Sequence, residues 1–263
     1  MGVCGSQVGQ GVGFSPGGGG PAAAGNAVDG GAGAVWTPAQ ISGVVCWLAI
    51  HGALHRWQES ITGIAATNAT ANGDPVGQID DPVSGKRWVA AGDSRRPTLV
   101  LPATGRAVGL NFAGGTSSNN TWDALYLENS AYLLGWLPTA GVGTILLTLK
   151  PAEDSNDGII LDCVNGTGTG SPVGFFCQKD SAGALQWVTY NGSGTAAVVN
   201  AKTSNGAIAA GGQRKIKLKF NGNGANHLAV NVDGVNLSMS GSADNNFPAT
   251  TVTKLTNNLY VGQ

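Results

Sequence analysis

The sequence predicts an all-β protein, folded as a two-sheet antiparallel sandwich. Residues 215–220 alternate lysine with apolar side chains, and residues 228–232 alternate apolar side chains with small or polar ones. A period of two places one row of side chains in a core and the other in solvent. Asp233-Gly234 follows the second run, and alternation that ends in such a turn is typical of a β-hairpin.

The expected elements follow one another along the chain. Thr37, as an N-cap, and Pro38 predict one helical turn, which leads into a buried strand over 43–48. A long loop region over 51–75 separates this strand from the others, which are expected at 76–80, 86–90, 107–112, 124–127, 143–150, 158–164, 173–179, 184–190, 195–200, 215–220, 227–233 and 257–261. Many short strands without a long amphipathic helix favour a sandwich.

Residues 1–35 differ in composition from the rest of the chain. They contain the glycine runs 17–20 and 30–31 and almost no large apolar side chains, so they cannot bury enough surface to offset chain entropy. We therefore expect two regions, a Gly-rich extended arm or linker at 1–35 and a β-sandwich at 36–263. The arm is either a disordered tail or a segment that becomes ordered against a neighbouring subunit.

Composition argues against several classes of partner. The chain has 263 residues, of which 11% are charged, and its net charge is -1. A nucleic-acid binder would need clustered cations, and a membrane-inserted protein would need an apolar run of about 18 residues, so we expect neither partner. Residues 1–30 show no secretory signal. Either this is the mature form, or the protein leaves its cell by another route, such as particle assembly and lysis.

No catalytic constellation is visible. Glycosidases need two carboxylates that flank the scissile bond. The glutamates are Glu59, Glu128 and Glu153, and none is followed by an aspartate two positions later on a strand. We therefore expect no enzyme, no catalytic residue and no cofactor.

No metal site is expected either. Residues 153–157 (Glu-Asp-Ser-Asn-Asp) form a solvated turn or, alternatively, a weak Ca²⁺ loop. His51 and His55 are four residues apart, which is a metal-like spacing on a helix. This segment has no adjacent glutamate base and is expected to be a loop.

Two cysteines fall on neighbouring expected strands. Cys163 ends the run 159–163, and Cys177 ends the run 173–177. A hairpin could place them opposite each other as a disulfide. The alternative is a pair of buried free thiols, because cysteine packs as a small hydrophobe.

Aromatic side chains near loops are the candidates for binding a ligand. Sugar rings stack on exposed aromatic faces, and the glycan-binding candidates are Trp122, Trp136, Trp187 and Tyr190. The alternative for each tryptophan is a place in the core or at a subunit interface.

Several segments together resemble a known family. The opening 36–47 (Trp-Thr-Pro, then Ile-Ser-Gly-Val-Val and Trp), Arg96-Pro97-Thr98, the run 228–234 and Leu259-Tyr260-Val261-Gly262 resemble the concanavalin A-like, laminin-G-like jelly-roll domains of phage virion and bacterial surface proteins. The resemblance implies a concanavalin A-like jelly roll. Family members continue past the last segment into one more strand, so the strand at 257–261 is expected at a sheet edge covered by the arm or a neighbouring subunit.

This resemblance implies a structural virion protein, a capsid decoration or tail-associated component of a tailed phage, located on the particle surface. A homo-oligomer, with a trimer favoured, would contact other virion proteins through residues 1–35. The alternative function is a glycan-binding adhesin or receptor-binding module, with cell-surface glycans as partners.

Overall fold

The structure is a computed structural model. It describes residues 44, 46–50, 55–60, 66–101, 108–113, 122–128, 142–151, 157–164, 173–191, 199–221, 228–242 and 259–262. The expected helical turn at 37–38 and the arm at 1–35 lie outside these residues.

Short strands make up most of the regular structure. In chain order they are β1 (Arg56–Trp57), β2 (Gln78–Asp80), β3 (Arg87–Val89), β4 (Thr98–Val100), β5 (Gly109–Asn111), β6 (Leu125–Leu127), β7 (Val142–Leu149), β8 (Gly158–Asp162), β9 (Val173–Lys179), β10 (Leu185–Asn191), β11 (Val199–Lys202), β12 (Arg214–Asn221), β13 (Leu228–Val232), β14 (Val235–Leu237), β15 (Ser240–Ser242) and β16 (Leu259–Val261). A 3₁₀ turn, η3 (Asp93–Arg95), lies between β3 and β4. Within the described ranges no helix has the length and apolarity that crossing a membrane requires.

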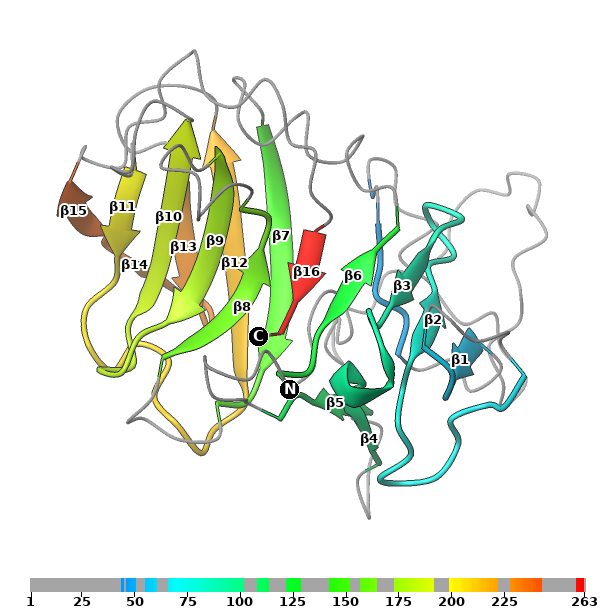
Figure 1. Cartoon of the computed structure of the whole chain (residues 1–263). Helices are drawn as coiled ribbons and strands as arrows, with labels where there is room; N and C mark the ends of the chain where they lie inside the picture. Colours follow the sequence, from blue (N-terminus) through cyan, green and yellow to red (C-terminus); the bar gives the residue numbers. More distant parts are fainter. Residues whose placement is uncertain are drawn as a thin grey trace, which may run out of the picture.

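The strands form two main sheets. The long sheet has the order β1-β2-β3-β6-β16-β8-β9-β10-β11-β15, and the four-stranded sheet has the order β14-β13-β12-β7. Figure 1 shows the four-stranded sheet stacked against the β8–β11 part of the long sheet, with the small β4–β5 hairpin near the other part. Neighbouring strands are antiparallel throughout, as in the registers of β9 with β10 and of β12 with β13.

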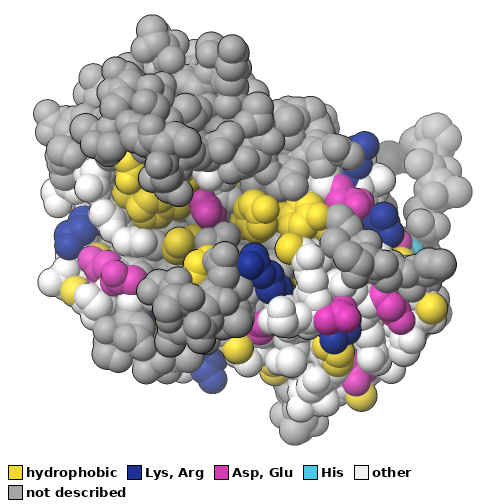
Figure 2. All heavy atoms as spheres, in the orientation of Figure 1, with side chains coloured by type: hydrophobic (Ala, Val, Ile, Leu, Met, Phe, Trp, Pro, Cys, Tyr) yellow, Lys and Arg dark blue, Asp and Glu magenta, His cyan; other side chains and the backbone are white. Residues whose placement is uncertain are grey.

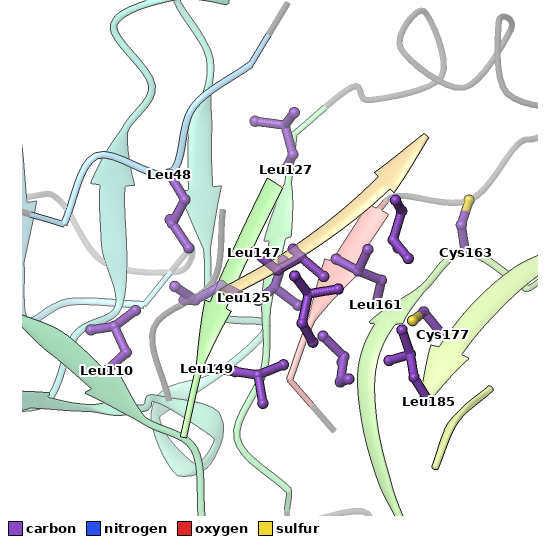
Figure 3. Close-up of a cluster of buried hydrophobic side chains, with 14 of the residues drawn as sticks. Leu48, Leu110, Leu125, Leu127, Leu147, Leu149, Leu161, Cys163, Cys177 and Leu185 are labelled. Carbon is purple, nitrogen blue, oxygen red and sulfur yellow. The ribbon is translucent and has the colours of Figure 1, made fainter. Parts of the chain in front are cut away.

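Aromatic rings join the two sheets through the core. Phe175 on β9 stacks on Trp187 of β10 with ring centroids 4.7 Å apart. Trp187 in turn meets Phe220 of β12 edge-on at 5.1 Å. Leucines surround these rings, among them Leu147 and Leu161, and Figure 3 shows leucines from several strands converging on one buried cluster. The predicted all-β, two-sheet antiparallel sandwich is therefore confirmed.

Alternation in β12 and β13 also has the expected consequence. Ile216, Leu218 and Phe220 are buried, whereas the lysines between them are exposed. The turn after β13 has φ values of 52° at Asp233 and 88° at Gly234. Positive φ at both central residues is typical of a two-residue hairpin turn.

One expectation about the last strand is wrong. β16 pairs with β6 on one side and with β8 on the other, so it lies inside the long sheet and has no free edge. Figure 1 shows it between these two strands. Both sides of β16 are therefore occupied by strands of the same chain.

Candidate functional site

One face of the long sheet carries a row of aromatic and polar side chains. The register of the six strands from β6 to β11 aligns one residue from each of them, namely Tyr126, Tyr260, Asp162, Phe176, Val188 and Asn200. Residues that lie opposite each other across a strand pair point to the same face. The neighbouring row is turned into the core and is buried: Leu125, Val261, Leu161, Cys177, Trp187 and Ala201. Five of the six residues in the first row are partly exposed, whereas Val188 is buried. The first row therefore faces away from the core, and we call this surface the aromatic face.

Two aromatic pairs lie on the aromatic face. Tyr126 and Tyr260 have ring centroids 5.4 Å apart at an interplanar angle of 48°. Phe176 and Tyr190 are 6.3 Å apart at 37°. All four rings are partly exposed. In the view of Figure 2, hydrophobic side chains gather near the middle of the visible surface, with an acidic side chain among them.

The space for the second pair depends on a glycine. Gly174 of β9 lies opposite Tyr190 of β10, and its φ is 129°. A Cβ atom at this position would overlap the carbonyl group of Cys163. At Gly174, β9 therefore runs close to the end of β8, and no side chain lies opposite the Tyr190 ring.

A carboxylate separates the two aromatic pairs. Asp162 ends β8, and its cross-strand partners are Tyr260 and Phe176. Its Oδ1 accepts a hydrogen bond of 2.8 Å from the backbone N–H of Val164. This bond orients the carboxylate between the two aromatic pairs.

Burial is the main reason that the phenols near the carboxylate stay protonated. The pKa of Tyr260 is raised, first by burial and then by the negative charge of Asp162, while the positive charge of Arg95 opposes the rise. Burial is also the main reason that the pKa of Tyr126 is raised. Both tyrosines are therefore neutral at pH 7, and their hydroxyl groups can donate as well as accept hydrogen bonds.

Side-chain amides extend the aromatic face beyond the rings. Gln178 Nε2 donates to Gln186 Oε1 at 2.6 Å, and Gln186 Nε2 donates to Asn200 Oδ1, also at 2.6 Å. These three side chains form a ladder across β9, β10 and β11. Each amide has further hydrogen-bonding capacity after these bonds, so the ladder offers ordered donors and acceptors to a polar ligand.

The predicted glycan-binding residues are only partly placed on this face. Tyr190 belongs to it. Trp187 does not, because its side chain is 1% exposed and its Nε1 donates to Thr189 Oγ1 at 2.9 Å. The alternative of a place in the core is therefore correct for Trp187. Trp122 is half-buried just before β6, and Trp136 lies outside the described residues.

Three aromatic members of the face were absent from the sequence prediction. Tyr126 and Phe176 each lie between two buried neighbours in their own strand, and Tyr260 precedes the buried Val261. These three residues can be identified in the sequence as aromatic residues on the outward row of a strand. A search for tryptophans alone does not find them.

The two cysteines on the sheet are buried free thiols. The hairpin of β8 and β9 is present, but its register places Cys177 opposite Leu161, and the N–H of Cys163 donates to Phe175. Neither thiol is part of a disulfide, and Figure 3 shows both beside the leucine cluster. Burial raises the pKa of each thiol to about 12, so both are protonated at neutral pH.

The remaining candidate metal ligands lie apart. His55 Nδ1 is 3.4 Å from Asp80 Oδ2 at the exposed end of β2, while His51 and Glu153 lie outside the described residues. Within the part of the chain that the structure describes, His, Cys, Asp and Glu side chains form no cluster of three that could hold a metal ion.

Comparisons with known proteins give a distant structural likeness. No protein-family model matches the chain, and no curated protein matches it. Among solved structures, the CBM40 of the Ruminococcus gnavus IT-sialidase aligns with a TM-score of 0.36 and 16% identity over 48% of this chain and 65% of that module. The same module bound to α2,3 sialyllactose and to α2,6 sialyllactose aligns equally, with coverage of 65% and 66% of its length.

Proposed function

We propose that this protein is a non-enzymatic carbohydrate-binding module whose ligand lies across the aromatic face. The observation that carries the proposal is the row in which two aromatic pairs flank Asp162 on the outer face of the long sheet. The C–H surface of a pyranose ring packs on aromatic faces of this kind. The carboxylate and the amide ladder supply hydrogen bonds to the hydroxyl groups of the sugar.

The spacing of the face favours an oligosaccharide. Tyr260 of β16 and Phe176 of β9 are separated by β8, which corresponds to about 10 Å between two strands that are not direct neighbours. A ligand in contact with both aromatic pairs must span this distance, which a single sugar ring does not.

The surroundings of Asp162 support binding without catalysis. Hydrolysis of a glycosidic bond needs a second carboxyl group facing the first, and the cross-strand neighbours of Asp162 are aromatic. Other aspartates of the described residues, such as Asp81 and Asp180, accept hydrogen bonds from backbone N–H groups in turns. These hydrogen bonds stabilise the loops in which the two aspartates lie.

Binding to oligosaccharides tests the proposal. We expect the full chain to bind some of the glycans on an array. Calorimetry then measures the dissociation constants of these glycans. Tyr260→Ala or Phe176→Ala should weaken binding about fivefold each, since a stacked ring contributes about 1 kcal/mol. Val100→Ala is the control, because Val100 is an exposed apolar side chain on β4, away from the face.

Two results would contradict the proposal. One is that no glycan binds. The other is that Val100→Ala weakens binding as much as Tyr260→Ala does, which would indicate a non-specific effect of surface truncation.

A virion role and a homotrimer stay predictions. They depend on residues 1–35, which lie outside the described residues, and the aromatic face is compatible with an adhesin carried on a particle as well as with a free module. Measuring the native mass of the full chain used for the glycan experiments provides the oligomeric state.

A further inference from the structure

The outer face of the four-stranded sheet has a charge distribution of its own. β12 is an inner strand of this sheet, between β13 and β7, and its outward residues Lys215, Lys217 and Lys219 are all exposed. Alternate residues of a strand are about 7 Å apart. Three ammonium groups therefore follow one straight line along the middle of the sheet, and we call this surface the lysine face.

The neighbouring strands place no carboxylate beside this line. On β7, the residues opposite Lys215, Lys217 and Lys219 are Thr148, Leu146 and Thr144, respectively. On β13, the residues opposite Lys217 and Lys219 are Asn231 and Ala229. Opposite charges that face each other across neighbouring strands would stabilise such a row. Among the described residues, none of the three ammonium groups takes part in an ion pair.

The nearest acid is already engaged at one end of the line. Asp233 accepts hydrogen bonds from the backbone N–H of Lys215 at 2.8 Å and from Arg214 Nη1 at 3.1 Å. Its pKa is lowered mainly by the first of these bonds. Asp233 therefore offsets charge near Lys215, whereas Lys217 and Lys219 have no such compensation.

We propose that the lysine face binds a linear acidic polysaccharide that runs along β12. Regularly spaced carboxylate or sulfate groups on such a polymer match a straight row of ammonium groups. Polar side chains near the row, namely Thr144 and Thr148 on β7, Asn231 on β13 and Asn236 on β14, can form hydrogen bonds with sugar hydroxyl groups. This surface is separate from the aromatic face, and the proposal does not depend on that face.

The composition of the lysine face favours a polysaccharide over two other polyanions. Its described members include no aromatic side chain on which nucleic-acid bases could stack. Leu146, which is 50% exposed, is a single large apolar side chain on the face, whereas a membrane-surface site usually buries several.

The test uses the full chain and soluble polygalacturonate, with neutral dextran as the uncharged probe. We expect polygalacturonate to bind at low salt, to be released as salt increases, and dextran not to bind. Each lysine near an anionic surface contributes about 1 kcal/mol, so Lys217→Gln should weaken binding roughly fivefold and Lys217→Gln/Lys219→Gln at least tenfold.

A matched variant separates a specific face from net charge. Lys86→Gln removes one positive charge next to β3 and should bind polygalacturonate as the unmodified chain does. Equal losses in Lys86→Gln and Lys217→Gln would overturn the proposal, as would an unchanged affinity in the double variant. Tighter binding to duplex DNA or to phosphatidylserine vesicles than to polygalacturonate would also overturn it. The substituted lysines are exposed, and circular dichroism verifies that each variant is folded.

Discussion

At the scale of single residues, Gly174 links the stability of the long sheet to the shape of the aromatic face. Its φ of 129° lies in a region that favours glycine. Its Cα faces the carbonyl group of Cys163 closely enough to exclude a side chain. The same close approach of β9 to β8 leaves the position opposite Tyr190 without a side chain.

We therefore expect Gly174→Ala to destabilise the protein by at least roughly 1–3 kcal/mol, because the strained φ adds to the steric overlap. Urea unfolding followed by tryptophan fluorescence measures this change. Gly158→Ala is the control, since a Cβ atom there would meet no other atom within 4 Å. If both variants unfold at the same urea concentration, the close contact of Gly174 contributes nothing to stability.

Glu59 shows how one exposed carboxylate responds to pH. Its carboxylate accepts hydrogen bonds from the backbone N–H groups of Ala66 at 3.1 Å and Thr67 at 3.0 Å. The bond from Ala66 is the main reason that its pKa is lowered from 4.5 to about 2. A lowered pKa in the folded state means that the ionised form stabilises the fold.

This stabilisation should be complete above the unfolded pKa of 4.5 and should disappear as the pH falls to about 2. We expect Glu59→Gln to be less stable than the unmodified chain at pH 7, with the difference shrinking between these two pH values. Unfolding free energies measured at several pH values provide the comparison. A difference that is independent of pH would show that ionisation of Glu59 is not involved.

At the scale of secondary-structure elements, strand positions were more predictable than strand pairing. The expected strands at 173–179 and 215–220 correspond to β9 (Val173–Lys179) and β12 (Arg214–Asn221), because alternation directly reports which side chains a sheet buries. Four strands were missed, namely β1, β4, β14 (Val235–Leu237) and β15 (Ser240–Ser242), and the strand expected over 43–48 is not formed at its described residues 44 and 46–48. β1 (Arg56–Trp57) falls in the expected loop region, and β4 (Thr98–Val100) is a short strand. Strands this short contain too few residues to show a period.

Pairing between distant segments could not be predicted in the same way. β16 joins β6 (Leu125–Leu127) and β8 (Gly158–Asp162), both of which lie far before it in the chain. Nothing in the alternation of Leu259, Tyr260 and Val261 indicates which strands will flank them. The family pattern suggested an edge, whereas the free backbone groups of β6 and β8 required a strand between them.

The candidate site could be predicted only in part, for a related reason. Trp187 shares its row with Leu185, so alternation places it in the core, and Tyr190 belongs to the opposite row. Sequence analysis grouped the two because both are aromatic and close in the chain. The aromatic face, in contrast, combines residues from β6, β16, β8, β9 and β10, and only the register brings them together.

At the scale of the whole molecule, β16 connects the two halves of the long sheet. On one side of it lie β1, β2, β3 and β6, and on the other side lie β8 to β11 with β15. Val261 is fully buried, and the backbone N–H of Gly262 donates to the carbonyl oxygen of Ile160 at 3.2 Å. Tyr260, from the same strand, is one of the four rings of the aromatic face.

A variant that ends at residue 258 should therefore lose cooperative folding. Without β16, the backbone groups of β6 and β8 that it pairs with are unsatisfied, and an unpaired buried group typically costs about 1–3 kcal/mol. Several such groups together equal much of the total stability of an ordinary domain, which is about 5–15 kcal/mol. Near-ultraviolet circular dichroism and urea unfolding should show loss of fixed aromatic packing and of a sharp transition.

Val261→Ala distinguishes the pairing of the strand from the packing of its side chain. This substitution keeps the backbone of β16 and removes only two methyl groups from the core, so we expect a cooperative transition at a lower urea concentration, with a loss of about 0.5–3 kcal/mol. If the truncated chain unfolded as sharply as Val261→Ala, the two halves of the sheet would be stable separately. Because β16 completes both the sheet and the tyrosine pair, the truncated chain should also lose glycan binding, whereas Val261→Ala should keep it.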